Sequence, residues 1–214
     1  MKNIILTIIT VLSFQLVSAQ EERINGFLFP TFSQAKILYK TGKTQENSLN
    51  YDAISQQMVF VKNDQVLAIA NPMVIDTIFI KGRKFIPNKD DAFYEIINYK
   101  NGSVYIERKS ELINAGKEGG YGTFSQTSAT TSFDSFSSST GRYSKLTIKE
   151  KIEETIKDRF FVKINDNMVP VDNLKKIIKV FPDKKDAIKD FVKNNEINCK
   201  NDDDLLYLLL FCLN

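Results

Sequence analysis

The chain has 214 residues, of which 43% are hydrophobic and 26% charged, and its formal net charge is +3 at pH 7. This length and composition suit one globular domain with a small appendage, and the near-neutral charge argues against a nucleic-acid-binding protein. The sequence contains no histidine. That absence removes nucleophiles activated by histidine, the usual zinc sites and the commonest general base.

Residues 1–19 have the features of a secretory signal peptide. Lys2 supplies the positive start, residues 4–17 are apolar, and Val17-Ser18-Ala19 fits a small-residue cleavage site. We therefore expect an exported chain that begins at Gln20, in the periplasm, on the cell surface or in the medium, with no membrane span after signal removal. No cysteine lies near this site, so a lipid anchor on cysteine is not supported.

Residues 20–171 are predicted to form a β-rich domain, because short apolar runs alternate there with turn residues. Asn63-Asp64 and Asn101-Gly102 each separate two such runs, which predicts a hairpin at each place. Pro72 interrupts the series, since proline cannot donate to a ladder. The runs in the first part of this domain are 36–40, 48–53, 58–61, 66–70, 77–80, 84–86, 93–99 and 103–107.

These runs predict sequential antiparallel strands, a meander. Ile96-Ile97 and Val66-Leu67 place apolar groups on both faces, so we expect the sheet to be partly covered on both sides. The simplest interpretation is a structural sheet. The alternative is a ligand-binding face lined by four tyrosines, which are Tyr51, Tyr94, Tyr99 and Tyr105.

The composition changes at residues 116–140, which are dominated by Gly, Ser and Thr. Such a stretch can bury little apolar surface, so we expect a mobile loop within the domain. It either has no role or becomes ordered on a partner, with aromatic side chains as anchors. The candidate interaction residues are Tyr121, Phe124, Gln126, Phe133 and Phe136.

Residues 160–164 and 168–171 predict a last hairpin, and residues 172–214 predict about three helices. Asp172 and Asp183 are the expected N-caps of the first two helices, and Asp202-Asp203-Asp204 begins the third. This third helix is apolar nearly all round, so we expect it to insert into the core. It would also carry Cys212 away from Cys199, which favours two free thiols over a disulfide.

Several segments together resemble a family of secreted Gram-negative bacterial proteins. The resemblance extends over most of the chain and implies an exported sheet-rich domain with a helical tail, but no chemistry. The segments are Leu49-Asn50-Tyr51-Asp52, Met58-Val59-Phe60, Ile69-Ala70-Asn71-Pro72, residues 76–85, Gly120-Tyr121-Gly122, residues 125–129 and residues 181–185.

The sequence thus predicts an α+β fold, with an antiparallel β-meander sheet of about 8–10 strands and about three C-terminal helices packed on it. The favoured function is a non-enzymatic interaction or structural module that binds an unknown protein or cell-envelope partner and needs no cofactor. One alternative is a carrier of a small apolar ligand or lipid. The other is a carboxylate-dependent hydrolase, for which Asp52, Asp76 and Glu95 are the candidate acids.

Overall fold

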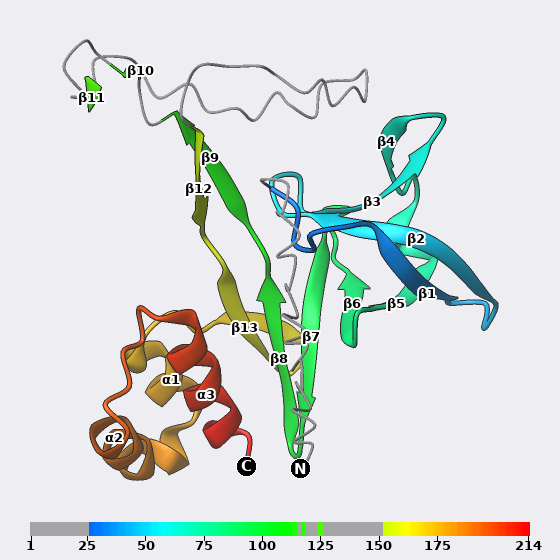
Figure 1. The fold of residues 1–214 in the computed structure, drawn as a ribbon. Helices are drawn as coiled ribbons and strands as arrows, with labels where there is room; N and C mark the ends of the chain where they lie inside the picture. The colour runs from blue at the N-terminus through cyan, green and yellow to red at the C-terminus, as the bar shows by residue number, and fades with distance from the viewer. Residues whose placement is uncertain (1–25, 115–116, 119–123, 126–151) are drawn as a thin grey trace, which may run out of the picture.

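The computed structural model describes residues 26–114, 117–118, 124–125 and 152–214. Within these residues, ten antiparallel strands form one sheet and three C-terminal helices pack on it, which confirms the expected α+β class (Figure 1). The strands of the large sheet are β1 (Ser33–Tyr39), β2 (Thr44–Asp52), β3 (Gln57–Lys62), β4 (Gln65–Ala68), β5 (Ile75–Ile80), β6 (Arg83–Pro87), β7 (Phe93–Tyr99), β8 (Gly102–Glu107), β13 (Arg159–Ile164) and β14 (Asn167–Pro170).

The spatial order of the sheet is β14-β13-β8-β7-β6-β5-β1-β2-β3-β4. Most neighbours are also successive in the chain, so the meander prediction is confirmed. The chain departs from simple succession twice: β5 returns to pair with β1, and β13 pairs with β8 after a long excursion. That excursion contains two further pairs, β9 (Ser110–Asn114) with β12 (Ile152–Ile156), and β10 (Lys117–Glu118) with β11 (Phe124–Ser125).

Tight turns set the register of the hairpins. Asn63 and Asp64 join β3 to β4 with φ angles of 52° and 58°, the left-handed conformation that these residue types tolerate best. Asn165 and Asp166 repeat this geometry between β13 and β14, at 47° and 66°. Both hairpins are confirmed.

The hairpin expected at Asn101-Gly102 is also confirmed, but its turn lies one residue earlier than the sequence suggested. Tyr99 pairs with Gly102, so Lys100 and Asn101 occupy the turn. Gly102 instead permits a close approach, because a Cβ there would lie 2.8 Å from Cδ2 of Leu213. Asn101 holds the same segment by donating its backbone N–H to the Leu213 carbonyl, at 3.2 Å. The β7–β8 turn therefore fixes the end of the helical segment.

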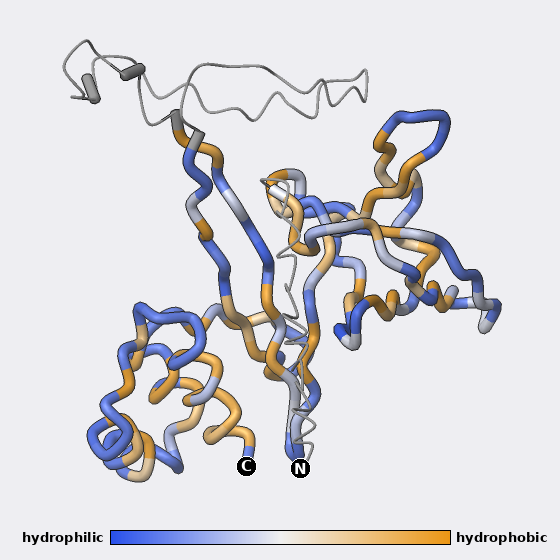
Figure 2. Tube along the Cα trace, viewed as in Figure 1, coloured by the Kyte–Doolittle hydropathy of each residue, from blue (hydrophilic) through white to orange (hydrophobic). Residues whose placement is uncertain are grey.

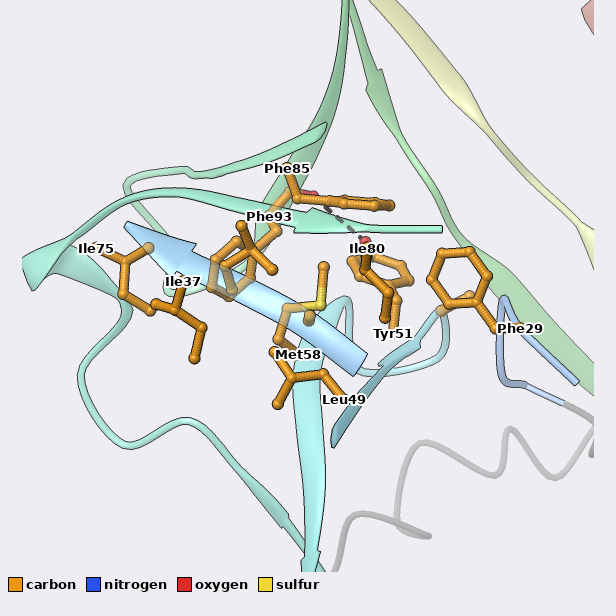
Figure 3. Close-up of a cluster of buried hydrophobic side chains, with 12 residues drawn as sticks. Phe29, Ile37, Leu49, Tyr51, Met58, Ile75, Ile80, Phe85 and Phe93 are labelled. Atoms are coloured by element: carbon orange, nitrogen blue, oxygen red, sulfur yellow. Dashed lines mark hydrogen bonds between the residues drawn. The ribbon is translucent and has the colours of Figure 1, made fainter. Parts of the chain in front are cut away.

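Two hydrophobic clusters stabilise the fold. The first is formed mainly by residues of β1–β3 and β5–β7, among them Tyr51, Met58 and Phe85 (Figure 3). Tyr51 stacks on Phe85 with ring centroids 5.4 Å apart. The second cluster lies between β8, β13 and the helices, with Val104, Ile106, Phe160 and Val162 supplied by the sheet.

The helices are α1 (Leu174–Val180), α2 (Lys185–Asn194) and α3 (Asp202–Cys212), with short 3₁₀ turns at Pro72–Val74 and Pro182–Lys184. Helix α3 is hydrophobic along most of its length, whereas α2 is largely hydrophilic (Figure 2). This difference in hydropathy follows from the position of the helices, because Leu205, Leu208 and Leu209 of α3 are buried in the second hydrophobic cluster. The expectation that α3 inserts into the core is confirmed.

Two of the expected helix caps are wrong. The N-cap of α1 is Asn173, whose side chain accepts from the Lys176 N–H at 3.0 Å, while Asp172 pairs with the Lys176 ammonium. Helix α2 begins after the 3₁₀ turn, so Asp183 lies in that turn and caps nothing. Pro182 ends α1, because it has no N–H with which to continue the helix.

Cys199 and Cys212 are both free thiols. Burial raises the pKa of both, that of Cys212 to about 11. Both groups therefore stay protonated, and unreactive as nucleophiles, near neutral pH.

We predict that the helical segment is an integral part of the fold. Removing residues 172–214 would expose Val104, Ile106, Phe160 and Val162, so the truncated protein should aggregate in size-exclusion chromatography. A point variant tests the same packing in the full chain. Leu208→Ala, at a fully buried site, should lower the unfolding free energy by about 2–5 kcal/mol.

The neighbouring Tyr207 is 53% exposed and supplies the matched control. Tyr207→Ala should cost clearly less than Leu208→Ala in the same urea denaturation series. Equal losses, or a soluble and cooperatively unfolding truncation, would contradict an integral helical segment.

Candidate functional site

A two-stranded ribbon extends from the sheet and is the most distinctive external feature of the structure. It consists of β9 and β12, which continue β8 and β13 away from the body (Figure 1). The register does not change between the two parts, since Arg159 faces Glu107 in the sheet and Ile156 faces Ser110 in the ribbon. Five residue pairs of the ribbon extend beyond this junction, a length of roughly 17 Å at 3.3 Å per residue.

Arg108 and Asp158 lie opposite each other where the ribbon leaves the sheet. The Arg108 guanidinium donates to the Asp158 carboxylate at 2.5 Å, and that carboxylate also accepts from the Lys109 N–H at 3.0 Å. Asp158 thus accepts a hydrogen bond from a backbone N–H where the regular ladder of hydrogen bonds is interrupted between sheet and ribbon. The Ser110 N–H donates to the Ala53 carbonyl at 2.9 Å, so the β2–β3 turn holds the first residue of the ribbon.

The ion pair at the ribbon base continues into the sheet through Glu95 of β7. Glu95 accepts from Arg108 Nε at 2.6 Å and from Arg83 Nε at 2.5 Å, and its side chain is only 6% exposed. Burial alone would raise the pKa of Glu95. The hydrogen bond from Arg83 and the charges of both arginines outweigh burial and lower it. Glu95 is therefore ionised at neutral pH.

Tyr51 connects the first hydrophobic cluster to the ribbon base. Its hydroxyl lies 2.9 Å from the Arg108 carbonyl and 3.3 Å from the Phe93 carbonyl, the latter drawn in Figure 3. Burial, followed by the nearby carboxylates Glu107, Asp158 and Asp52, raises the pKa of this phenol. The hydroxyl therefore remains a donor, and it ties the backbone of Arg108 to the core.

A second ion pair holds the opposite face of the same junction. Glu107, 7% exposed, accepts from the Arg159 guanidinium at 2.5 Å and from the Gln56 side-chain amide at 2.6 Å. Gln56 has a φ of 60° and belongs to the turn that also contacts the ribbon through Ala53. The junction is thus held on both faces by charge-assisted hydrogen bonds, the stronger kind.

The two faces of the ribbon differ. Leu112 and Ile156 lie on one face as diagonal cross-strand neighbours, with Ile156 56% exposed, while Ile113 lies on the other face and is 41% exposed. Within the part of the chain that the structure describes, no third strand pairs with β9 or β12. The ribbon thus presents apolar side chains on a two-stranded element, which is marginally stable by itself in water.

The candidate interaction residues belong to the stretch of chain that connects β9 with β12. Phe124 lies in β11, where it pairs with Glu118 of β10. The other four, Tyr121, Gln126, Phe133 and Phe136, lie outside the described residues, as does most of the expected loop 116–140. Their connection to the ribbon could not be inferred from the sequence, because the pairing of β9 with β12 was not expected.

The four tyrosines do not form one binding face. Tyr51 is in the core, whereas Tyr94 and Tyr105 contact each other on the outer face of the sheet, with centroids 6.4 Å apart. Tyr99 is 37% exposed near the β7–β8 turn, with the Lys100 ammonium 5.9 Å from its ring centroid. The structure therefore gives no support to a binding face made by all four.

The three candidate acids each have their own partners. Asp52 accepts from the Ile54 N–H and the Ser55 hydroxyl, and Asp76 accepts from the Thr77 hydroxyl. Glu95 is held between two arginines. Two acids that cooperate in glycoside hydrolysis face the scissile bond together, and these contacts do not bring any two of the three onto a shared partner.

A groove of about 480 Å³ lies between the β13–β14 hairpin and the start of the helical segment. Its walls are apolar, and two lysines are among its lining residues. The lining residues are Ile164, Val169 and Pro170 from the hairpin, and Lys176, Lys179, Val180 and Pro182 from α1 and the following turn. Its volume is within the usual range of about 300–1,000 Å³ for small-molecule sites.

In comparisons with protein families, with curated proteins and with solved structures, the chain gave no match. The resemblance to secreted Gram-negative proteins therefore stays a prediction. Among the described residues, no helix combines the length and apolar character needed to cross a bilayer.

We predict that Glu95→Gln destabilises the protein strongly. The variant leaves Arg83 without its buried counter-charge and removes one of the two carboxylates that bind Arg108, which keeps Asp158. The loss should therefore be about 3 kcal/mol, the lower end for a broken buried ion pair. Urea denaturation measures it. Asp166→Asn removes the partner of Lys163 at an exposed turn and is the control, with no measurable change expected.

Glu95 also predicts loss of stability in acid. Its pKa is lowered in the folded protein from the ordinary value of 4.5. The folded state therefore gains stability above that value and loses it as the pH falls through the lowered pKa. The wild-type melting temperature should fall more steeply below pH 4.5 than that of Glu95→Gln. Parallel curves would show that another carboxylate controls acid unfolding.

Proposed function

We propose that the protein is a non-enzymatic interaction module, exported to the cell envelope or beyond, that binds a protein partner through the ribbon and the stretch the ribbon carries. One observation carries the proposal: a two-stranded ribbon with exposed isoleucines leaves the sheet at a junction fixed by buried ion pairs. An apolar element without its own core gains stability when a partner covers it.

The anchoring supports binding rather than a passive extension. A ribbon whose base is held loses less conformational freedom on association, so more of the contact energy appears as affinity. Leu112 and Ile156 supply an apolar patch on one face, with Glu154 and Ser110 beside it. The Ser110 hydroxyl donates to Glu154 at 2.5 Å, which fixes the polar border of that patch.

The connecting stretch adds the second part of the proposed surface. Tyr121, Phe124, Gln126, Phe133 and Phe136 lie among Gly, Ser and Thr residues. Ordering such residues costs about 1–2 kcal/mol each, and burial of one phenylalanine returns about 1.5–3 kcal/mol. A partner that also supplies backbone hydrogen bonds offsets this cost better than burial of the three phenylalanine rings alone.

Site-specific photo-crosslinking tests the proposal. A variant with benzoylphenylalanine at position 156, on the face of the apolar patch, should give one discrete adduct with an envelope protein when it is expressed with residues 1–19 in the cells that make the protein. The matched control is position 79, since Phe79 is also exposed, at 43%, but lies on β5 in the body of the sheet. That position should give no such adduct.

Deletion of residues 123–140 should abolish the adduct from position 156 while the melting temperature stays nearly unchanged. Equal adducts from positions 156 and 79, or none from position 156, would overturn the proposal. A deletion that collapses the fold would instead make the connecting stretch structural.

A further inference from the structure

We propose that the groove between the β13–β14 hairpin and α1 binds a small amphiphile with an aliphatic chain and a single carboxylate, as in a fatty acid. This site is separate from the ribbon and does not depend on the function proposed for it. The inference rests on the shape and lining of the groove, on its charge and on the strand that forms one of its edges.

The floor of the groove is an extension of the second hydrophobic cluster. Ile164, Val169 and Val180 are partly buried and pack against that cluster on one side, while the groove exposes their other side. Ile177, one helical turn before Val180, is fully buried in the same cluster. An aliphatic chain laid on these side chains would therefore be covered from below by packed protein.

The charge at the groove favours an anion. Lys176 donates to Asp172 at 2.6 Å, and this contact satisfies much of its charge. Lys179 is exposed and makes no ion pair with any residue that the structure describes. A carboxylate placed over Lys179 would gain a charge-assisted hydrogen bond, whereas a cationic head would be repelled.

The edge strand favours an aliphatic ligand over an extended peptide. Strand β14 ends the sheet, so its outer side is free of another strand of the described sheet. A peptide that added there would need backbone donors along it, but Pro170 has no N–H and the strand has only four residues. An aliphatic chain that lies on the apolar side chains of the groove needs no hydrogen bonds from this edge.

Titration calorimetry of the full exported chain with dodecanoate, below its micelle concentration, tests the assignment. We expect saturable binding with one site per chain. Lys179→Gln should weaken it about tenfold, the usual effect of losing one charge-assisted contact. Val169→Gln should weaken it at least as much by making the floor polar. Lys189→Gln, on the exposed side of α2, is the matched control and should bind like the wild type.

Other probes and other results distinguish the alternatives. Dodecyltrimethylammonium should not bind measurably, and dodecanol should bind more weakly than dodecanoate. No saturable binding of dodecanoate, equal binding of the cationic amphiphile, or indifference to both Lys179→Gln and Val169→Gln would overturn the proposal. Tighter binding of an apolar peptide with a free C-terminal carboxylate would overturn the assigned class of ligand. Equal melting temperatures of the variants exclude misfolding as the cause of any loss.

Discussion

The salt bridges of Arg108 are the constraint on which the rest of the arrangement depends. Arg108 binds Glu95 on one side and Asp158 on the other, and Glu95 also binds Arg83. These four residues join β6, β7 and both strands of the ribbon base. In the sheet, Glu95 faces Phe85 of the first hydrophobic cluster on one neighbouring strand and Ile106 of the second on the other. The charges therefore lie where the two clusters meet.

This position explains why the sheet has two hydrophobic clusters instead of one. The linked ion pairs of Arg83, Glu95, Arg108 and Asp158 lie between the clusters. Apolar side chains that covered these charged groups would separate them from their partners. Strands β1–β3, β5 and β6 supply most of the first cluster, and the helices cover the second. Burial of these ion pairs has a large desolvation cost, and well-packed apolar residues in their place are often equally stabilising. The distinctive contribution of the ion pairs is to fix where the strands separate.

The sequence predicted the parts whose signals are local. Turn residues such as Asn63-Asp64 and Asn165-Asp166 located hairpins, and the nearly all-apolar residues 205–213 located α3 and its burial. Pairings between distant residues were not predicted. Arg108 and Asp158 are separated by 50 positions, and nothing near either residue indicates the other. The pairing of β5 with β1 was not predicted for the same reason. Pro72 indicates that the series of strands is interrupted, but not which strand the next one pairs with.

The strands of the ribbon were not predicted, because their sequence lacks a regular alternation of apolar and polar residues. Ile152 and Ile156 are four residues apart, a spacing that puts them on one face of either a helix or a strand. Glu153 and Glu154 lie between them without alternation, so no element was assigned there. The sequence therefore placed the functional candidates in the stretch after residue 116, which stays a prediction, but it missed the ribbon that carries that stretch.

The register between β9 and β12 is set by the buried residues of β8 and β13, and not by contacts within the ribbon. A slip of one residue in β9 and β12 would turn every side chain to the other face. Because the register is continuous with β8 and β13, the same slip would move Val104, Ile106, Phe160 and Val162 away from the helices. It would also separate Arg108 from Asp158. The buried pairs in the sheet thus specify the pairing of residues about 17 Å beyond it, which an isolated two-stranded element could not maintain.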